Sequence, residues 1–140
     1  MTLHLVKLCV GVESVEELRF WQNKRVKEGA PRGYPRPPYH TTRMTPRRRE
    51  ELLNGGSLYW VIQGWMCVRQ RLEDVVPFVD GEGVGRCHLV LARDLVLVEP
   101  VPRRAFQGWR YLAGPDAPAD CGIAEDPGSG LGEELSRLGL

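Results

Sequence analysis

The order of hydrophobic and polar residues along the chain predicts mainly β-strands. Apolar residues alternate with polar ones over 57–63 and again over 65–72, as strands with one face in a core require. Gly64 between them is compatible with a tight turn or with a kink in one strand. Three further strands are predicted over residues 2–10, 86–92 and 95–99. One face of the first of these carries Leu3, Leu5 and Lys7.

A first helix is predicted after the N-terminal strand. Ser14 and Glu17 have the spacing of a capping box, which indicates a helix over residues 15–27. Three apolar residues at helical spacing form its expected buried stripe: Val15, Leu18 and Trp21. The end of the helix carries three cations: Lys24, Arg25 and Lys27. The negative end of the helix dipole is sufficient to explain why cations occur there.

A second, short helix is predicted over residues 47–54. Thr45 is a suitable N-cap, and Pro46 would stand at the first helical position, where a missing N–H is no loss. Gly55 and Gly56 then end the helix, because glycine tolerates a left-handed cap.

Three consecutive arginines, residues 47–49, would lie in the first turn of this helix. The helix dipole favours anions at its N-terminus, so cations there are unfavourable unless an anion binds between them. Free N–H groups beside arginines are suited to phosphate. The structural alternative is that Arg47 pairs with Glu50 and Glu51 while the other two arginines are solvated.

These elements predict an α+β fold. Two short helices would pack on a curved, mostly antiparallel sheet or small barrel, because few helices precede a late run of strands. The outline is that of PUA-like and ASCH-like RNA-binding barrels, an analogy at the level of fold only. We expect a single domain over residues 1–112. Residues 113–140 are expected to form a loosely ordered, acidic C-terminal tail.

The net charge of +1 conceals an uneven distribution of charge. Residues 19–49 contain ten Lys or Arg against one acid, a net charge of +9. Residues 113–140 contain six acids against one arginine, a net charge of −5. This polarity suggests a basic face that binds an acidic partner.

Several classes of chemistry are disfavoured. The four cysteines are isolated, and none has a histidine at ligand spacing, so no metal site is expected. The motifs of P-loop NTPases, α/β-hydrolases and zinc proteases are absent from the sequence, so catalytic residues stay unknown and no cofactor is expected. No apolar run is long enough to cross a bilayer, and no signal peptide is recognised. We therefore expect a cytoplasmic protein that does not bind membranes, of unknown oligomeric state.

Arginines interleaved with aromatic residues recur along the chain. Arginine binds phosphate, and exposed aromatic side chains stack on bases. The residues expected to bind a phosphate or nucleic acid are Tyr39, His40, Arg43, Arg47, Arg48, Tyr59, Arg69 and Arg71. Trp60 is expected to be a core residue, and Tyr59, on the opposite strand face, is expected to lie at the surface. For His40 the structural alternative is a loop histidine bonded to the backbone, since no nucleophile or acid is nearby.

Three blocks of the sequence, LHLVKLCVGVESVEEL, TRMTPRRREELLNGGSLYWVIQG and PRRAFQGWRYL, together resemble a family of short bacterial proteins, the domain of unknown function DUF1489. The resemblance covers nearly all of the chain except the tail. It implies no activity and no catalytic residue, because none is assigned to the family.

Three functions remain open. The first is a binding module for nucleic acid, RNA in the first place, or for another phosphate-bearing ligand. The second is a small enzyme that acts on a phosphorylated or acidic small molecule, with arginines holding the anion and His40 as acid or base. The third is a protein-interaction factor that uses the basic face. A closed pocket around His40 would favour the enzyme, and an open groove would favour nucleic acid.

Overall fold

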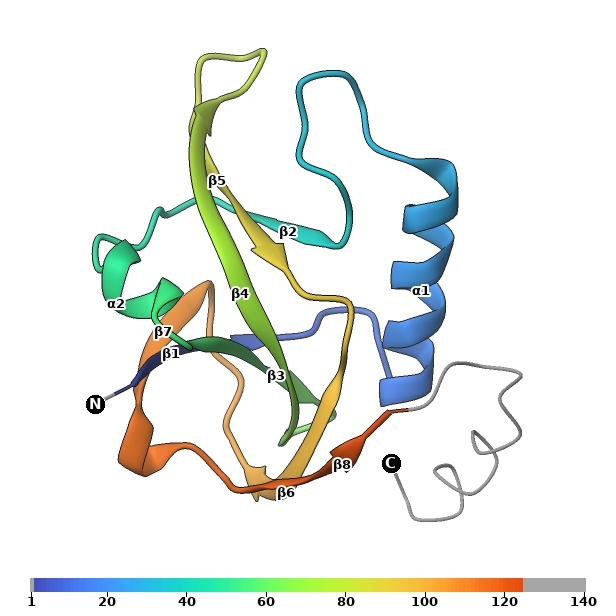
Figure 1. Cartoon of the computed structure of the whole chain (residues 1–140), viewed down its shortest axis with the longest axis vertical. Coiled ribbons are helices and arrows are strands. Elements are labelled where there is room, and N and C mark those ends of the chain that lie inside the picture. Colours follow the sequence, from blue (N-terminus) through green and yellow to red (C-terminus); the bar gives the residue numbers. More distant parts are fainter. Residues whose placement is uncertain (1, 125–140) are drawn as a thin grey trace.

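The computed structural model describes residues 2–124 (Figure 1). The described residues form two α-helices, a short 3-10 helix and an eight-stranded sheet. The first half of the chain contains β1 (Leu3–Leu8), α1 (Val15–Glu28), β2 (Tyr39–Thr42), α2 (Arg49–Leu53) and β3 (Ser57–Ile62). The second half contains β4 (Trp65–Val79), β5 (Gly85–Leu91), β6 (Val96–Pro102), β7 (Trp109–Ala113), η1 (Gly114–Asp116) and β8 (Asp120–Ile123).

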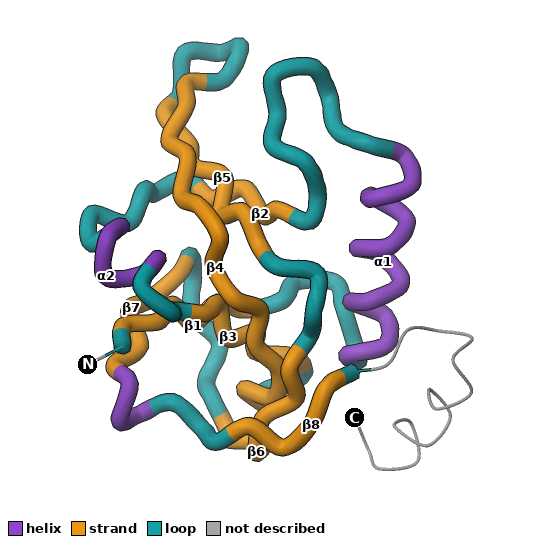
Figure 2. Tube along the Cα trace, in the orientation of Figure 1, coloured by secondary structure: helices purple, strands orange, loops and turns teal. Residues whose placement is uncertain are grey.

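The sheet is mostly antiparallel, which confirms the α+β class. Its strand order is β2-β5-β4-β3-β1-β7, with β6 paired to β4 and β8 paired to β6. The pair β1–β3 is parallel, and α1 lies in the connection between these two strands. The strand order is that of an open sheet. Figure 2 shows α1 running along one side of the sheet, with α2 on the opposite side of the view.

β4 is the central strand and is longer than predicted. It pairs with β3 and β6 along its first half and with β5 along its second half. The prediction ended this strand at Leu72. A register shift between Leu72 and Asp74 carries the strand past a pair of acidic residues instead, and Pro77 still lies opposite Cys87 of β5. Proline is tolerated where its missing N–H faces away from the neighbouring strand.

The ambiguity at Gly64 is settled in favour of a turn. Gln63 and Gly64 both have positive φ, 51° and 84°, and they connect β3 to β4 as a two-residue hairpin. Positive φ at both central positions is the property of a type I′ turn, whose twist matches that of the flanking strands.

Two clusters of buried side chains lie on the two faces of β3. The larger cluster contains Trp60, as predicted, together with Leu5, Leu58 and Leu72. The smaller cluster contains Tyr59, which is 3% exposed. The prediction that Tyr59 is a surface residue is therefore wrong. β3 lies between β1 and β4, and both of its faces are covered.

α1 begins as predicted, but the residues that it buries differ from the expected stripe. The Ser14 hydroxyl accepts a hydrogen bond from the Glu17 N–H at 3.1 Å. Val15 and Leu18 are buried, but Trp21 is 48% exposed. Arg19, which is not part of the expected stripe, is 5% exposed and donates to the carbonyl of Arg93 at 2.6 Å. A long side chain can bury its stem while its head group finds a backbone acceptor.

α2 is shorter than predicted and begins later. Its N-cap is Arg48, with no side-chain cap, and Pro46 is not its first residue. The predicted cap at Thr45 is therefore wrong. The N–H groups of Arg47 and Arg48 both donate to the hydroxyl of Tyr111, at 3.0 and 3.2 Å. A tyrosine from β7 therefore occupies the position that we expected an anion to fill.

Regular structure continues past the boundary expected at residue 113. β7 ends there, η1 follows, and β8 pairs antiparallel with β6 from Asp120 onward. The ordered part therefore extends at least to Ala124, whose N–H donates to the carbonyl of Leu95 at 2.8 Å. The remainder of the expected acidic tail lies outside the described residues.

Candidate functional site

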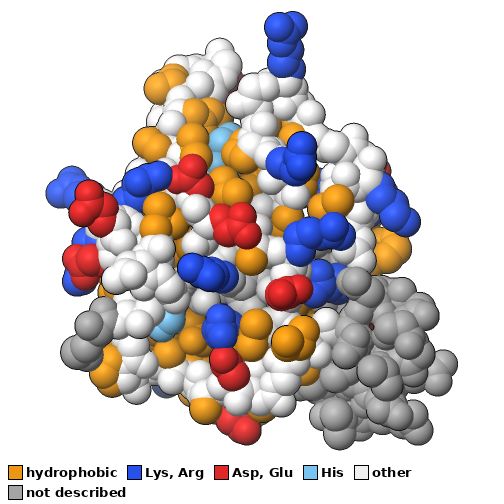
Figure 3. Space-filling model, viewed as in Figure 1, with side chains coloured by type: hydrophobic (Ala, Val, Ile, Leu, Met, Phe, Trp, Pro, Cys, Tyr) orange, Lys and Arg blue, Asp and Glu red, His pale blue; other side chains and the backbone are white. Residues whose placement is uncertain are grey.

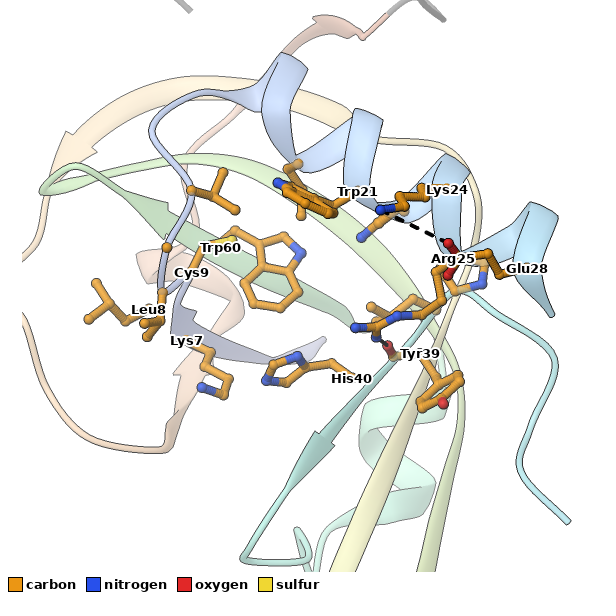
Figure 4. Close-up of a pocket in the computed structure, with 17 residues that line it drawn as sticks. Lys7, Leu8, Cys9, Trp21, Lys24, Arg25, Glu28, Tyr39, His40 and Trp60 are labelled. Atoms are coloured by element: carbon orange, nitrogen blue, oxygen red, sulfur yellow. Dashed lines mark hydrogen bonds and ion pairs between the residues drawn. The ribbon is translucent and has the colours of Figure 1, made fainter. Parts of the chain in front are cut away.

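A pocket of about 500 Å³ lies between α1 and the sheet. Its walls come from the end of β1 and the turn after it, one face of α1, and the start of β2. Figure 4 shows Trp60 and His40 at its centre, with Trp21 on the helix side. Pockets of this size, with apolar walls and a few polar groups, are typical of small-ligand sites.

The indole of Trp60 forms the floor and is held from below. Its Nε1–H donates to Oε1 of Gln70 at 2.9 Å. The ring of His40 meets it edge-on, with 5.1 Å between centroids. Trp60 is 3% exposed, so it belongs to the core and to the pocket at once.

Gln70 on β4 is the buried polar residue that organises this region. It is fully buried. Its side-chain amide exchanges two hydrogen bonds of 2.8 Å with the amide of Gln22 on α1. The same amide donates to the carbonyl of Ala92 at 3.0 Å. Both of its amide hydrogens and both lone pairs of its oxygen are therefore satisfied, and the network ties α1 to the sheet at the pocket.

Two cations at the pocket have no acidic partner among residues 2–124. Lys7 is half-buried at the end of β1, and burial lowers the pKa of its ammonium group. Arg25 of α1 donates to the carbonyl of Tyr39 at a long 3.3 Å and lies over the Tyr39 ring, 5.6 Å from its centroid. A third cation, Lys24, is 4.0 Å from Glu28, and both of these side chains are largely exposed. The pocket is therefore net positive.

His40 lies between Lys7 and Arg25 (Figure 4). Burial, followed by the charges of Lys7 and Arg25, lowers the pKa of His40 to about 4. Desolvation and like charge both disfavour imidazolium. At neutral pH the ring is uncharged and presents one donor and one acceptor nitrogen.

Cys9 also lines the pocket but is not suited to nucleophilic chemistry. Burial, as the largest cause, raises the pKa of its thiol to about 12. The thiolate is the reactive form of cysteine, and a buried apolar setting suppresses it.

The wall formed by Pro38 and Tyr39 is positioned by an aromatic cluster behind it. The ring of His88 on β5 stacks on Phe78, with 4.0 Å between centroids. The ring of Tyr34 also contacts His88, with 4.7 Å between centroids. Thr41 and His88 share a side-chain hydrogen bond of 3.0 Å. The proline-rich segment 29–38 is therefore anchored at Tyr34, and β2 is anchored next to the pocket.

Two of the eight predicted ligand-binding residues, Tyr39 and His40, line the pocket. Arg43, Arg47 and Arg48 do not line it. They belong to the segment between β2 and α2, which lies on the side of the view away from α1 (Figure 1). Arg43 and Arg47 are exposed. Arg48 forms two side-chain hydrogen bonds with Glu51, one of them 3.0 Å from Nε to Oε1. The pairing expected of Arg47 is therefore made by its neighbour.

The remaining predicted residues have structural environments. Arg69 binds the carboxylate of Asp120 through two hydrogen bonds and donates to the Ser57 hydroxyl at 3.0 Å. This ion pair lowers the pKa of Asp120 and joins β4 to β8. Tyr59 is buried against His4, with 5.0 Å between centroids. Arg71 is exposed on β4.

The arginine run is a neutralised surface. Arg49 donates to the carbonyl of Val75 at 3.1 Å and forms an ion pair with Asp74. Figure 3 shows Lys and Arg side chains next to Asp and Glu side chains around α2. Glu51 of α2 pairs with Arg48, and Asp74 of β4 pairs with Arg49. Among the described residues, Arg47 is the one arginine of the three without an ion pair.

Sequence reasoning missed Lys7, Arg25 and Gln70. Lys7 continues the face of β1 that carries Leu3 and Leu5, and a cation in phase with two core residues is a signal that could have been used. Arg25 was explained by the helix dipole, which accounts for its position on the helix but not for its contacts. Gln70 has no local signal, since its partners come from α1, β3 and the turn after β5.

The fold and the pocket define a small α+β protein with a basic, aromatic-lined site. The chain belongs to the family described as Protein of unknown function (DUF1489), which matches residues 5–140. Searches of curated proteins and of solved structures each returned no match.

The described residues were also searched for metal sites and for membrane-spanning helices. Within residues 2–124, no three of the His, Cys, Asp and Glu side chains are grouped so that they could hold a metal ion. Neither described helix combines the length and the apolar character that a membrane crossing needs.

Proposed function

We propose that the protein is a binding module for nucleic acid, RNA in the first place, or for another phosphate-bearing ligand, and that the ligand binds in the pocket beside α1. The observation that carries the proposal is the pair of cations that have no acidic partner among residues 2–124, Lys7 and Arg25, on either side of a neutral His40 above the Trp60 floor. Cations that lack an acidic partner favour an anion, and aromatic walls favour a planar ring.

The shape of the sheet supports the same proposal. β4 pairs with β3, β5 and β6, so the sheet curves around the larger core cluster. We propose that this curved sheet is related in outline to PUA-like and ASCH-like RNA-binding barrels. This part of the proposal rests on an analogy of fold. A cytoplasmic location is part of the same proposal.

Titration with a fluorescently labelled single-stranded RNA oligonucleotide at several salt concentrations tests this function. Affinity should fall as salt rises, because each neutralised phosphate releases counterions. Replacing Lys7→Gln should weaken binding by about 1.5–3 kcal/mol, roughly tenfold to more than a hundredfold, the usual contribution of a hydrogen bond to a charged group.

The matched control is Lys27→Gln. Lys27 is an exposed residue of the same helix as Arg25 and does not line the pocket. The affinity of this variant for RNA should stay within about twofold of the wild-type value. The proposal fails if no RNA binds at low salt, or if both variants weaken binding equally.

A second function is favoured by one observation, the position of His40 in the pocket lining, against the Trp60 ring. A small enzyme that acts on a phosphorylated or acidic molecule would use Lys7 and Arg25 to hold the anion. With a pKa of about 4, His40 is not protonated at neutral pH and would serve as a hydrogen-bond acceptor rather than as an acid. Turnover of a bound phosphate ester that is lost in His40→Gln, with binding retained, would distinguish the enzyme from the binding module.

A further inference from the structure

A second hollow adjoins the pocket. It has a volume of about 460 Å³ and is lined by Glu28, Gly29 and Pro31 at the end of α1 and by the first residues of β2. Four residues line both hollows: Arg25, Glu28, Tyr39 and His40. The two hollows therefore lie on either side of a shared wall, and each is large enough for a small ligand group.

The two hollows differ in chemistry. The first contains Trp21, Trp60, Leu18 and Leu91 and is suited to a flat apolar ring. The second contains the last turn of α1 and Thr41. The last carbonyls of a helix have no partner in a following turn, and together with the negative end of the helix dipole they disfavour a phosphate there and favour hydrogen-bond donors such as a ribose hydroxyl or a base amine.

Arg25 stands in the shared wall. Its guanidinium has five N–H donors, and among the described residues it makes one long hydrogen bond, to the carbonyl of Tyr39. Lys7 lies on the other side of His40 (Figure 4). Glu28 lines the same wall, but its carboxylate lies 4.0 Å from the ammonium group of Lys24. The place for a phosphate is therefore at Arg25, between the aromatic hollow and the polar one.

We infer that the ligand is a single-stranded nucleic-acid segment of two nucleotides, with one base in the aromatic hollow, the linking phosphate at Arg25 and the second nucleoside in the polar hollow. This inference rests on the proposed function and names the unit that the site recognises. Base stacking supplies sequence-tolerant affinity, and the neutral second hollow supplies contacts to the sugar.

The experiment compares ligands of increasing length on the full chain. Nucleoside monophosphates, the dinucleoside monophosphates ApA, UpU, CpC and GpG, and the matching trinucleotides are titrated while tryptophan fluorescence is followed. At least one dinucleoside monophosphate should bind tenfold or more tightly than its nucleoside monophosphate, although it carries less charge. The third nucleotide should add less than threefold.

Filling the second hollow sharpens the test. Pro31 is exposed and lines the second hollow but not the first. Pro31→Trp should reduce dinucleotide affinity to that of the mononucleotide, while Pro31→Ala should keep the tenfold ratio. Thermal melts of both variants show that each is folded.

The outcomes separate the two proposals. Equal affinity for mononucleotide and dinucleotide, or an unchanged ratio in Pro31→Trp, overturns the two-nucleotide site and leaves the binding module standing. A steady gain with each added nucleotide also overturns it, because it indicates an open track. Failure of every ligand, including a long RNA at low salt, overturns the proposed function itself.

Discussion

The arginine run at residues 47–49 and the pocket beside α1 are both basic, but they differ in whether their cations have partners. In the run, Arg48 pairs with Glu51 and Arg49 pairs with Asp74. At the pocket, neither Lys7 nor Arg25 forms an ion pair within the described residues, and the one acid of the lining, Glu28, lies 4.0 Å from Lys24. The denser cluster of charge is thus the less available one, because acids from α2 and β4 lie next to it.

A run of cations shows where positive charge is dense along the sequence. It does not show which of these cations lack an acidic partner in the folded protein. Asp74 lies well apart from Arg49 along the chain, and only the fold brings them together. Likewise the N–H groups before α2 are satisfied by a tyrosine from β7. An anion site needs cations that folding leaves without an acidic partner, and within the described residues Lys7 and Arg25 at the pocket meet this condition.

The largest expected effect is on the network that builds the pocket. Gln70→Leu removes the acceptor of the Trp60 indole and leaves the Gln22 amide and the Ala92 carbonyl without their partner. Buried groups left unsatisfied cost about 1–3 kcal/mol each, so the free energy of unfolding should fall by about 3 kcal/mol in urea titrations. Gln107→Leu, on an exposed residue, is the control and should change it by less than about 0.5 kcal/mol. Equal effects would show that the pocket is not held by this amide.

The next effect is the pH dependence that His40 confers. Its folded-state pKa is about 4 against 6.5 in the unfolded chain. Below pH 6.5 the unfolded chain takes up a proton that the folded protein does not, so stability falls as pH drops towards 4. Between pH 7 and pH 5 the protonation of His40 in the unfolded chain should lower the free energy of unfolding by about 2 kcal/mol.

His40→Gln should reduce that loss by the same amount in urea titrations at the two pH values. The comparison of variant and wild type is needed because burial also lowers the pKa of His4 and His88, which act in the same direction. An identical pH dependence in both proteins would mean that His40 titrates normally.

A third prediction compares the two basic regions by their effect on the pKa of His40. Lys7→Gln removes one of the charges that oppose imidazolium, so the pKa of His40 should rise by about 0.5–1. Arg47→Gln should leave it unchanged. Imidazole NMR signals followed against pH measure both. A rise of equal size in the Arg47 variant would show that the arginine run acts on the pocket at a distance.

The smallest effects are expected in the arginine run. Arg49→Gln removes an ion pair between half-exposed side chains and should cost about 0.5 kcal/mol. Arg47→Gln, with no ion pair to lose among the described residues, should be neutral within error. Thermal melts at low salt and in 1 M NaCl measure both, and the cost at Arg49 should shrink in salt. A cost at Arg49 that is unaffected by salt would point to its hydrogen bond with Val75 instead.

Local signals predicted the local parts of the fold. Ser14 marks the start of α1, because a capping hydrogen bond spans only three residues. The alternation in residues 57–63 and 65–72 located β3 and the first half of β4. Tyr59 was misplaced because alternation shows that two faces differ, not that one of them is wet. The second core cluster that covers it is built by β1, β4, β6 and β7.

The candidate site depends on non-local contacts, and so it was predicted only in part. Tyr39 and His40 were identified by residue type, but β2 was missed, because its four residues are held by pairing with β5. Their expected neighbours were the arginines that follow in sequence. The actual neighbours, Lys7 and Arg25, come from β1 and α1, and no spacing in the sequence connects them.

The position of β1 has a consequence for synthesis of the chain. β1 lies between β3 and β7, with Leu5 opposite both Leu58 and Tyr111. At about 5–20 residues per second, a ribosome needs roughly 5–20 s to pass from the first of these strands to the last. Throughout that interval the fully buried Leu5 side chain belongs to an apolar strand with at least one open edge. The nascent chain must therefore keep its first strand from pairing wrongly until its final neighbour has been made.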